Sequence, residues 1–296
     1  MTEPRLSAYL LLADPAFIEE SVRSYYPLVR RIVASYDRSH LSWSGHPVRT
    51  GECIERLKRI DTECKVEFVP GDFSSPNRPA EECETLQRNA ALRLAAEGAD
   101  WVIQLDTDEV LPDPRCFSAS VSAAHHRNLA ALDFPARWLL AEPRPGLFVE
   151  RATAFLRTAS GFPGPAAIRA DQTLAFCRAI EAPPTHPLPQ IFRVDIRRRS
   201  ADPARKTGWP VHALIDRGQS ILHFSWVRTA AEVADRLQFH GHATSIAPSF
   251  LTEWTKANDT PIRFVVGKAV HLRGEHYRLC RLPITSTMAP RTESLS

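Results

Sequence analysis

The clearest hydrophobic pattern in the chain is a short apolar run that ends abruptly in carboxylates. Trp101 to Leu105 is rich in β-branched and aromatic residues, follows Gly98, and is followed by Asp106, Asp108 and Glu109. A run of this length and composition predicts a buried strand of an α/β sheet. Charge at the carboxyl end of such a strand lies where open α/β sheets bind ligands.

The same alternation of strand and helix patterns precedes this run. Strands are expected at 6–12, 32–37 and 65–69, and helices at 15–27, 51–60 and 80–97. In the last of these helices, Leu86, Ala90 and Leu94 recur every four residues. Strands joined through helices at this spacing predict βαβ units and therefore a parallel sheet.

The second half of the chain has a less regular pattern. We expect a helix from 114 to 126, extended chain at 129–140, strands at 148–156, 173–176, 191–196 and 220–227, and a helix at 230–243. Near the end, Phe264-Val265-Val266 is interpreted as a further strand. The predicted fold is therefore α/β, with a mostly parallel sheet flanked by helices and a C-terminal helical and extended extension.

Composition excludes several classes of protein. A net charge of +3 with 24% charged residues, dispersed along 296 residues, does not mark a nucleic-acid binder. The six cysteines have no C-x-x-C spacing, which favours reduced cytosolic thiols over a zinc site or a disulfide framework. The chain contains no run of about 18 apolar residues, the length that a transmembrane helix needs, so no such helix is predicted. We expect a cytoplasmic protein, with peripheral attachment at the inner face of the membrane left open.

The spacing of Asp106 and Asp108 favours a site for a cation. Two carboxylates held this close repel each other, so the site should take up a proton or bind a positive charge. Mg²⁺ or Mn²⁺ suits one or two carboxylates together with the phosphates of a substrate. Asp37 and Asp72 also follow predicted strands, which would place them along the same rim as Asp106. An Asp-x-Asp pair alone is also common in solvated turns, and its position after a buried strand favours the metal.

Four segments together resemble a GT-A glycosyltransferase, and bacterial family 2-like enzymes in particular. They are Ile-Val-Ala-Ser-Tyr-Asp37, Gln-Arg88-Asn-Ala, Leu-Asp106-Thr-Asp108-Glu and Ile-Leu-His223-Phe-Ser-Trp. The resemblance covers about residues 5–245, and the usual Asn-Glu-Glu after the first strand is replaced by Leu-Ala-Asp14.

The resemblance implies a GT-A-type Rossmann-like fold and a domain division. Residues 1–228 would form the glycosyltransferase domain, with a nucleotide-sugar half at about 1–115 and an acceptor half at about 116–228. Residues 229–296 would form a C-terminal helix and tail packed on it.

The resemblance also implies roles for individual residues. Asp106, Asp108 and His223 would hold a divalent ion, Mn²⁺ or Mg²⁺, while the nucleotide-sugar would contact Asp37, Asp72, Arg88 and Asp106. The alternatives are a hydrogen-bonded core histidine for His223 and an ion pair between Arg88 and Glu84, one helical turn back.

The acceptor side is less well defined by the sequence. An inverting enzyme needs a carboxylate base, for which Asp202 is the first candidate and Asp171, Asp195 and Asp216 are others. A retaining mechanism stays open. Trp138, Trp209 and Trp226 are candidates for stacking on an acceptor sugar, although tryptophan is more often a core residue.

The resemblance implies a metal-dependent, hexosyltransferase-like enzyme, and a role in polysaccharide biosynthesis is expected from the family alone. It would move a sugar from a nucleotide-diphospho-sugar, UDP- or GDP-linked, to a saccharide or lipid-linked acceptor. A sugar-phosphate nucleotidyltransferase is one alternative, but its Gly-rich, basic loop is absent from Ala13-Asp-Pro-Ala-Phe17. An inactive protein that binds glycans or nucleotide-sugars is another.

Overall fold

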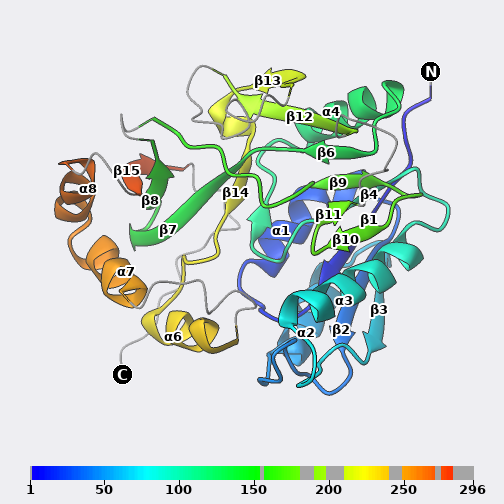
Figure 1. The fold of residues 1–296 in the computed structure, drawn as a ribbon, viewed down its shortest axis with the longest axis horizontal. Helices are drawn as coiled ribbons and strands as arrows, with labels where there is room; N and C mark the ends of the chain where they lie inside the picture. Colours follow the sequence, from blue (N-terminus) through cyan, green and yellow to red (C-terminus); the bar gives the residue numbers. More distant parts are fainter. Residues whose placement is uncertain are drawn as a thin grey trace.

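In a computed structural model, the chain forms a large mixed sheet flanked by helices and a second, five-stranded sheet beside it (Figure 1). The structure describes residues 2–153, 157–180, 190–197, 210–239, 249–270 and 275–282. Within these residues, no helix is both long and apolar enough to cross a membrane.

The large sheet has the strand order β13-β12-β6-β9-β4-β1-β2-β3. Its strands are β1 (Leu6–Leu11), β2 (Ile32–Asp37), β3 (Val66–Gly71), β4 (Trp101–Ile103), β6 (Ala131–Asp133), β9 (Ala167–Arg169), β12 (Ile191–Ile196) and β13 (Ala213–Ile215). All neighbouring strands are parallel except β9, which is antiparallel to both β4 and β6. The expected α/β class with a mostly parallel sheet is therefore confirmed.

Both faces of this sheet are buried, which explains the uninterrupted apolar runs of its central strands. Along β1, Leu6, Ala8 and Leu10 pack with α1 (Ile18–Tyr25), α2 (Thr50–Ile60) and α4 (Pro114–His126). Tyr9 and Leu11 face the other way and pack with α3 (Ala80–Ala95). Alternate residues of a strand point to opposite faces, so one strand supplies both cores.

The second sheet has the order β15-β8-β7-β14-β5 and collects distant parts of the chain. Its strands are β5 (Glu109–Val110), β7 (Ala136–Arg144), β8 (Leu147–Ala152), β14 (Ile221–His223) and β15 (His276–Arg281). The C-terminal helices are α6 (Ala230–Phe239), α7 (Phe250–Asp259) and α8 (Pro261–Val270). Helices α7 and α8 pack through Trp254 and Phe264 onto Val149 and Tyr277 of this sheet. A small hairpin, β10 (Leu174–Phe176) and β11 (Ala179–Ile180), completes the strands.

Three of the expected elements are different in the structure. The strand expected at 220–227 covers only Ile221–His223, and the N–H of Val227 donates to the carbonyl of Phe224 at 3.1 Å in a turn. The strand predicted at Phe264-Val265-Val266 is wrong, because these residues lie inside helix α8. Pro261 occupies the first turn of that helix, where its missing N–H costs nothing. A short apolar run does not distinguish a buried helix from a strand. The extended chain at 129–140 is divided, since β6 ends at Asp133 and β7 begins at Ala136 in the other sheet.

Candidate functional site

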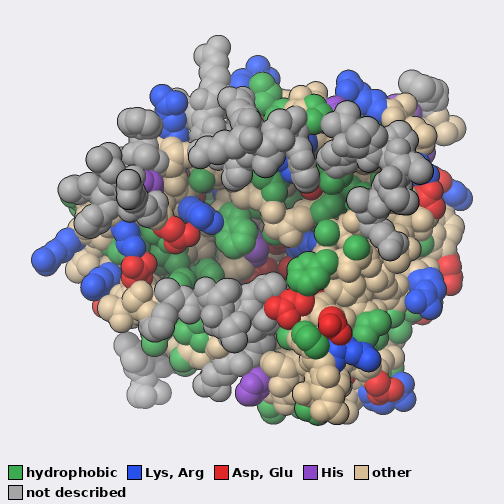
Figure 2. All heavy atoms as spheres, viewed as in Figure 1, with side chains coloured by type: hydrophobic (Ala, Val, Ile, Leu, Met, Phe, Trp, Pro, Cys, Tyr) green, Lys and Arg blue, Asp and Glu red, His purple; other side chains and the backbone are tan. Residues whose placement is uncertain are grey.

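A cavity of about 570 Å³ opens beside the carboxyl ends of β1, β2 and β4. It is lined by the loop after β1, by the loop after β2, by one face of α3 and by the acidic turn 106–108. The second sheet contributes Trp138 and His223, and α6 contributes Arg236. Figure 2 shows acidic and histidine side chains at the centre of this face, with hydrophobic side chains around them.

Asp106 is held between two buried guanidinium groups. Its Oδ1 accepts a hydrogen bond from Arg88 Nη2 at 2.9 Å, and its Oδ2 lies 2.6 Å from Arg178 Nη2. Burial opposes ionisation, but Arg178 and Arg88 outweigh it and lower the pKa of Asp106 to about 2. Arg88 also donates to Glu84 at 2.7 Å, so the expected helix ion pair and the contact to the acidic turn are both present. The side chain of Asp106 is 37% exposed and faces the cavity.

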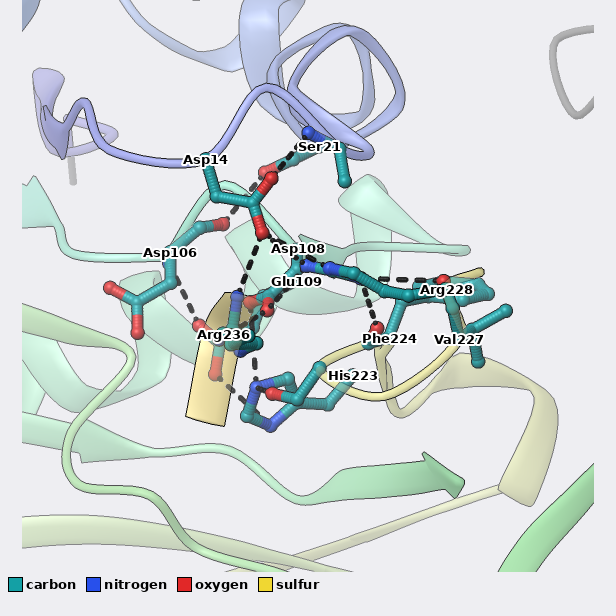
Figure 3. A network of polar contacts seen from close by, with 12 residues as sticks. Asp14, Ser21, Asp106, Asp108, Glu109, His223, Phe224, Val227, Arg228 and Arg236 are labelled. Atoms are coloured by element: carbon teal, nitrogen blue, oxygen red, sulfur yellow. Dashed lines mark hydrogen bonds and ion pairs between the residues drawn. The ribbon is translucent and has the colours of Figure 1, made fainter. Parts of the chain in front are cut away.

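Asp108 belongs to a closed arrangement of two carboxylates and two guanidinium groups (Figure 3). Arg236 donates to Asp108 Oδ2 at 3.1 Å and to Asp14 Oδ2 at 2.9 Å. Arg228 lies between the same two carboxylates, at 3.3 Å from Asp108 and 3.0 Å from Asp14. Although burial acts in the opposite direction, Arg236, His223 and Arg228 hold the pKa of Asp108 well below its usual range.

His223 completes this cluster from strand β14. Its Nε2 lies 3.4 Å from Asp108 Oδ1 and 2.5 Å from Ser225 Oγ, while its Nδ1 is 3.8 Å from Glu109 Oε1. Burial favours the neutral ring, but Asp108 and Glu109 outweigh burial and raise the pKa of His223. The ring also packs on Trp138, with 4.7 Å between the ring centroids.

The arrangement of Asp106 and Asp108 does not fit a preformed site for a divalent cation. Each of their four oxygen atoms already has a positively charged or protonatable partner, from Arg88, Arg178, Arg228, Arg236 or His223. Among the described residues, no group of three His, Cys, Asp or Glu side chains is placed to hold a metal ion. Mn²⁺ and Mg²⁺ need oxygen atoms that are free to coordinate, and here guanidinium groups occupy those positions.

Asp37 and Asp72 were also expected to contact the nucleotide, but only Asp37 of these two lines the cavity. Asp37 lines the cavity, but its oxygens accept the backbone N–H groups of Ser39, Phe73 and Ser74 at 2.8–2.9 Å. Despite partial burial, these bonds lower the pKa of Asp37. The side chain of Asp72 is 84% exposed, lies 3.5 Å from Arg38 and does not line the cavity.

The candidate bases in the described residues lie away from the cavity. Asp195 is buried on β12 and accepts a hydrogen bond from Ser160 Oγ at 2.8 Å. Asp171 pairs with Arg169, and Asp216 caps the short 3₁₀ helix at Arg217–Gln219. Asp202 lies outside the described residues, and so does Trp209.

Two of the candidate aromatic residues do line the cavity. Trp138 and Trp226 both lie at its wall, and Trp226 also packs on Phe250, with 4.4 Å between the ring centroids. The position of the Trp138 side chain requires a glycine at residue 161, because a Cβ atom added to Gly161 would lie 1.8 Å from the indole Nε1. The structure therefore brings Trp138, Trp226, His223 and the acidic turn together.

Sequence reasoning identified Arg88 but missed Arg178, Arg228 and Arg236, the other arginines that surround the acidic turn. Arg228 and Arg236 are eight residues apart and follow His223 closely, and that helical spacing is a usable signal. Arg178 comes from the β10–β11 hairpin and has no local signal. Asp14 does not cap α1, which begins at Ile18; it accepts the N–H of Ala16 at 3.0 Å in the loop before that helix and pairs with Arg228.

Comparison with known proteins gives no family assignment. No family model matches the chain, and no curated protein matches it. Among solved structures, mannose-6-phosphate isomerase from Helicobacter pylori matches 49% of this chain and 55% of its own, with 14% identity and a TM-score of 0.29. A mannose-1-phosphate geranyltransferase from Thermus thermophilus matches 50% of this chain and 49% of its own, with 10% identity and a TM-score of 0.26. The chain thus spans about half the length of each, and likeness this low assigns no activity to it.

Proposed function

We propose that the chain is a glycosyltransferase that moves a sugar from a nucleoside-diphosphate-sugar to a saccharide or lipid-linked acceptor. The observation that supports this proposal is the cavity at the carboxyl ends of β1, β2 and β4, which places Arg88, Arg178 and Arg236 around Asp106 and Asp108. Open α/β sheets bind ligands at this edge. Guanidinium groups suit the oxygens of phosphates because they donate in a fixed, planar fork.

The charged groups match what sugar transfer requires. Negative charge develops on the departing diphosphate, and donors fixed in place before the reaction stabilise that charge. Burial alone would lower the pKa of Arg178, but Asp106 and Glu109 raise it, so this guanidinium stays charged throughout the accessible pH range. A second carboxylate also holds each of these arginines in position, as Glu109 does for Arg178 at 2.6 Å and Glu84 does for Arg88 at 2.7 Å.

The aromatic residues that line the cavity suit an acceptor. Trp138 packs on His223, and Trp226 lies below Arg236, so both rings are next to the charged groups. Tryptophan combines a large apolar face with a polar edge, a combination that suits a sugar ring with its apolar faces and polar rim. The requirement for Mn²⁺ or Mg²⁺ stays a prediction from the family resemblance, and the arginines supply positive charge without it.

A sugar-phosphate nucleotidyltransferase is the second candidate. Four arginines near one cavity would also suit a nucleoside triphosphate, which carries more charge than a diphosphate. The two activities differ in their product, since a glycosyltransferase releases a nucleoside diphosphate and a nucleotidyltransferase releases pyrophosphate. An inactive nucleotide-sugar-binding protein would release neither.

The first experiment is a thermal-shift panel of UDP-, GDP-, dTDP- and CMP-linked sugars, each with Mn²⁺ and with EDTA. A ligand that binds only the folded protein raises its melting temperature. The matched variants are Asp106→Asn and Asp72→Asn, since both carboxylates follow strands of one sheet but only Asp106 lines the cavity. We expect one nucleotide to stabilise the wild type and Asp72→Asn but not Asp106→Asn. No shift with any nucleotide-sugar would overturn the proposal.

A further inference from the structure

Trp43 lies at the tip of a tight turn in the loop between β2 and α2, and this turn borders the cavity. The N–H of Gly45 donates to the carbonyl of Ser42 at 2.9 Å, so residues 42–45 form a β-turn with Trp43 in its second position. Gly45 has a φ of 86°, which glycine adopts at no steric cost. A β-bridge between Leu41 and Pro47 closes the loop behind the turn. The backbone of Trp43 is therefore fixed.

The side chain of Trp43 is fixed as well. Its indole Nε1 donates to Gln87 Oε1 at 2.7 Å, and Gln87 Nε2 donates to Ser35 Oγ of β2 at 3.3 Å. Gln87 is buried on α3 and is followed by Arg88, the partner of Asp106. Adjacent residues of one helix thus hold the indole ring and an arginine of the acidic turn.

Trp43 packs against an apolar cluster that includes Tyr9, Leu11 and Val33. Leu11, Leu12 and Leu41 line the cavity together with this ring. In the described part of the chain, no aromatic ring or cation stacks on Trp43. The cavity therefore combines a rigid aromatic ring with a separate group of arginines.

We propose that Trp43 is the stacking platform for the base of a nucleoside diphosphate, with Gln87 as its positioning residue. The proposal rests on the proposed function, because it takes the donor to be a nucleotide. Asp37 was expected to contact the base, but its oxygens are occupied by backbone N–H groups. Stacking is tolerant of base identity, since every base has a π-face. Trp43 thus contributes to the affinity for the base, while the specificity for one base over another depends on other residues.

The test compares two substitutions that keep an apolar side chain at this position. Trp43→Phe retains an aromatic ring, while Trp43→Leu retains apolar bulk without one. Binding of UDP, GDP and inorganic pyrophosphate to the full chain is measured by titration calorimetry, with Mn²⁺ and with EDTA. Trp254→Phe is the matched control, because Trp254 is buried on α7 and does not line the cavity. Circular dichroism and the melting temperature establish that each variant is folded.

We expect Trp43→Phe to bind the nucleoside diphosphate within about threefold of the wild type and Trp43→Leu to bind it about tenfold more weakly. Pyrophosphate has no base, so its affinity should be the same in all variants. Equal nucleotide affinity in Trp43→Leu and Trp43→Phe would overturn the role of Trp43 and leave the proposed function intact. A wild-type protein that binds neither UDP nor GDP would overturn both proposals.

Discussion

Arg236 Nη2 lies 3.1 Å from Asp108 Oδ2, so a residue of helix α6 neutralises the carboxylate at the end of the acidic turn. The same guanidinium reaches Asp14 at 2.9 Å. Two carboxylates that repel each other are thereby held close without a metal ion. The position in which a cation was expected is next to a side chain that carries its own positive charge.

Arg236→Gln should increase the affinity of the protein for Mn²⁺. The substitution removes one of the two guanidinium groups that contact Asp14 Oδ2 and Asp108 Oδ2, and the lower positive charge at these oxygens favours Mn²⁺. We expect Mn²⁺ to raise the melting temperature of Arg236→Gln more than that of the wild type. Arg49→Gln is the control, because Arg49 lies 3.6 Å from Asp14 but is half exposed. An equal response of all three proteins to Mn²⁺ would contradict competition between Arg236 and the cation.

Asp108→Asn should lower the free energy of unfolding by about 3 kcal/mol. The reason is Arg228, whose side chain is 0% exposed and would lose one of its two carboxylate partners. Urea denaturation measures the change. Asp72→Asn should alter the free energy of unfolding by less than about 0.5 kcal/mol, since Asp72 is 84% exposed and its ion pair with Arg38 lies at the surface. A similar stability of Asp108→Asn and Asp72→Asn would show that the arginines do not need this carboxylate.

The stability of the protein should fall at both low and high pH. The loss at low pH comes from protonation of Asp106 and Asp108, and the loss at high pH comes from deprotonation of His223. Asp106 and Asp108 have lowered pKa values, so their contribution is complete above about pH 5 and is lost as the pH falls towards 2. His223 has a raised pKa, so its contribution is complete below about pH 6 and is lost as the pH rises through the pKa of the folded state.

This linkage is checked by melting temperatures between pH 6 and pH 9. The wild type should lose about 2 °C more than His223→Gln over this interval, because only the wild type loses a stabilising proton. His46→Gln serves as a control, since His46 lies in the exposed loop after β2. Parallel curves for the wild type and His223→Gln would show that His223 binds its proton equally in the folded and unfolded states.

Gly161→Ala should displace Trp138 from the cavity wall. An added Cβ would lie 1.8 Å from Trp138 Nε1, and Gly161 cannot move away because it exchanges two backbone hydrogen bonds of 2.8 Å with Ala136. We expect a loss of about 1–3 kcal/mol in stability and a raised KM for the acceptor. Gly218→Ala has open space around its Cβ and should change neither. An unchanged acceptor KM in Gly161→Ala would argue against an acceptor role for Trp138.

Local patterns predicted the first part of the large sheet well, because β1, β2, β3 and β4 alternate with helices along the chain, but they did not predict β9 or β13. The apolar run before Asp106 became β4, and the four-residue repeat around Ala90 became α3. The second sheet was predicted only in part. Strands β7, β8 and β14 overlap expected extended segments, whereas β5 has only two residues and β15 joins the sheet by pairing with the distant β8. Pairing between such distant segments leaves no periodic signal in either one.

The candidate site was predicted only in part for the same reason. Asp106, Arg88 and His223 belong to recognisable segments, and the structure brings them to one cavity. Arg178 and Arg236 reach the acidic turn from a hairpin and a helix whose sequences look ordinary. A carboxylate pair in a sequence indicates that a positive charge is needed, but it does not distinguish a metal ion from a guanidinium group.

The acidic turn also joins the two sheets. Strand β4 belongs to the large sheet and β5 to the second, and only residues 104–108 separate them. The carbonyl of Asp108 accepts the N–H of Phe224 at 2.9 Å, which ties the turn to the segment after β14. The charged groups of the acidic turn are therefore held by backbone pairing on both sides, with β4 in the large sheet and β5 in the second.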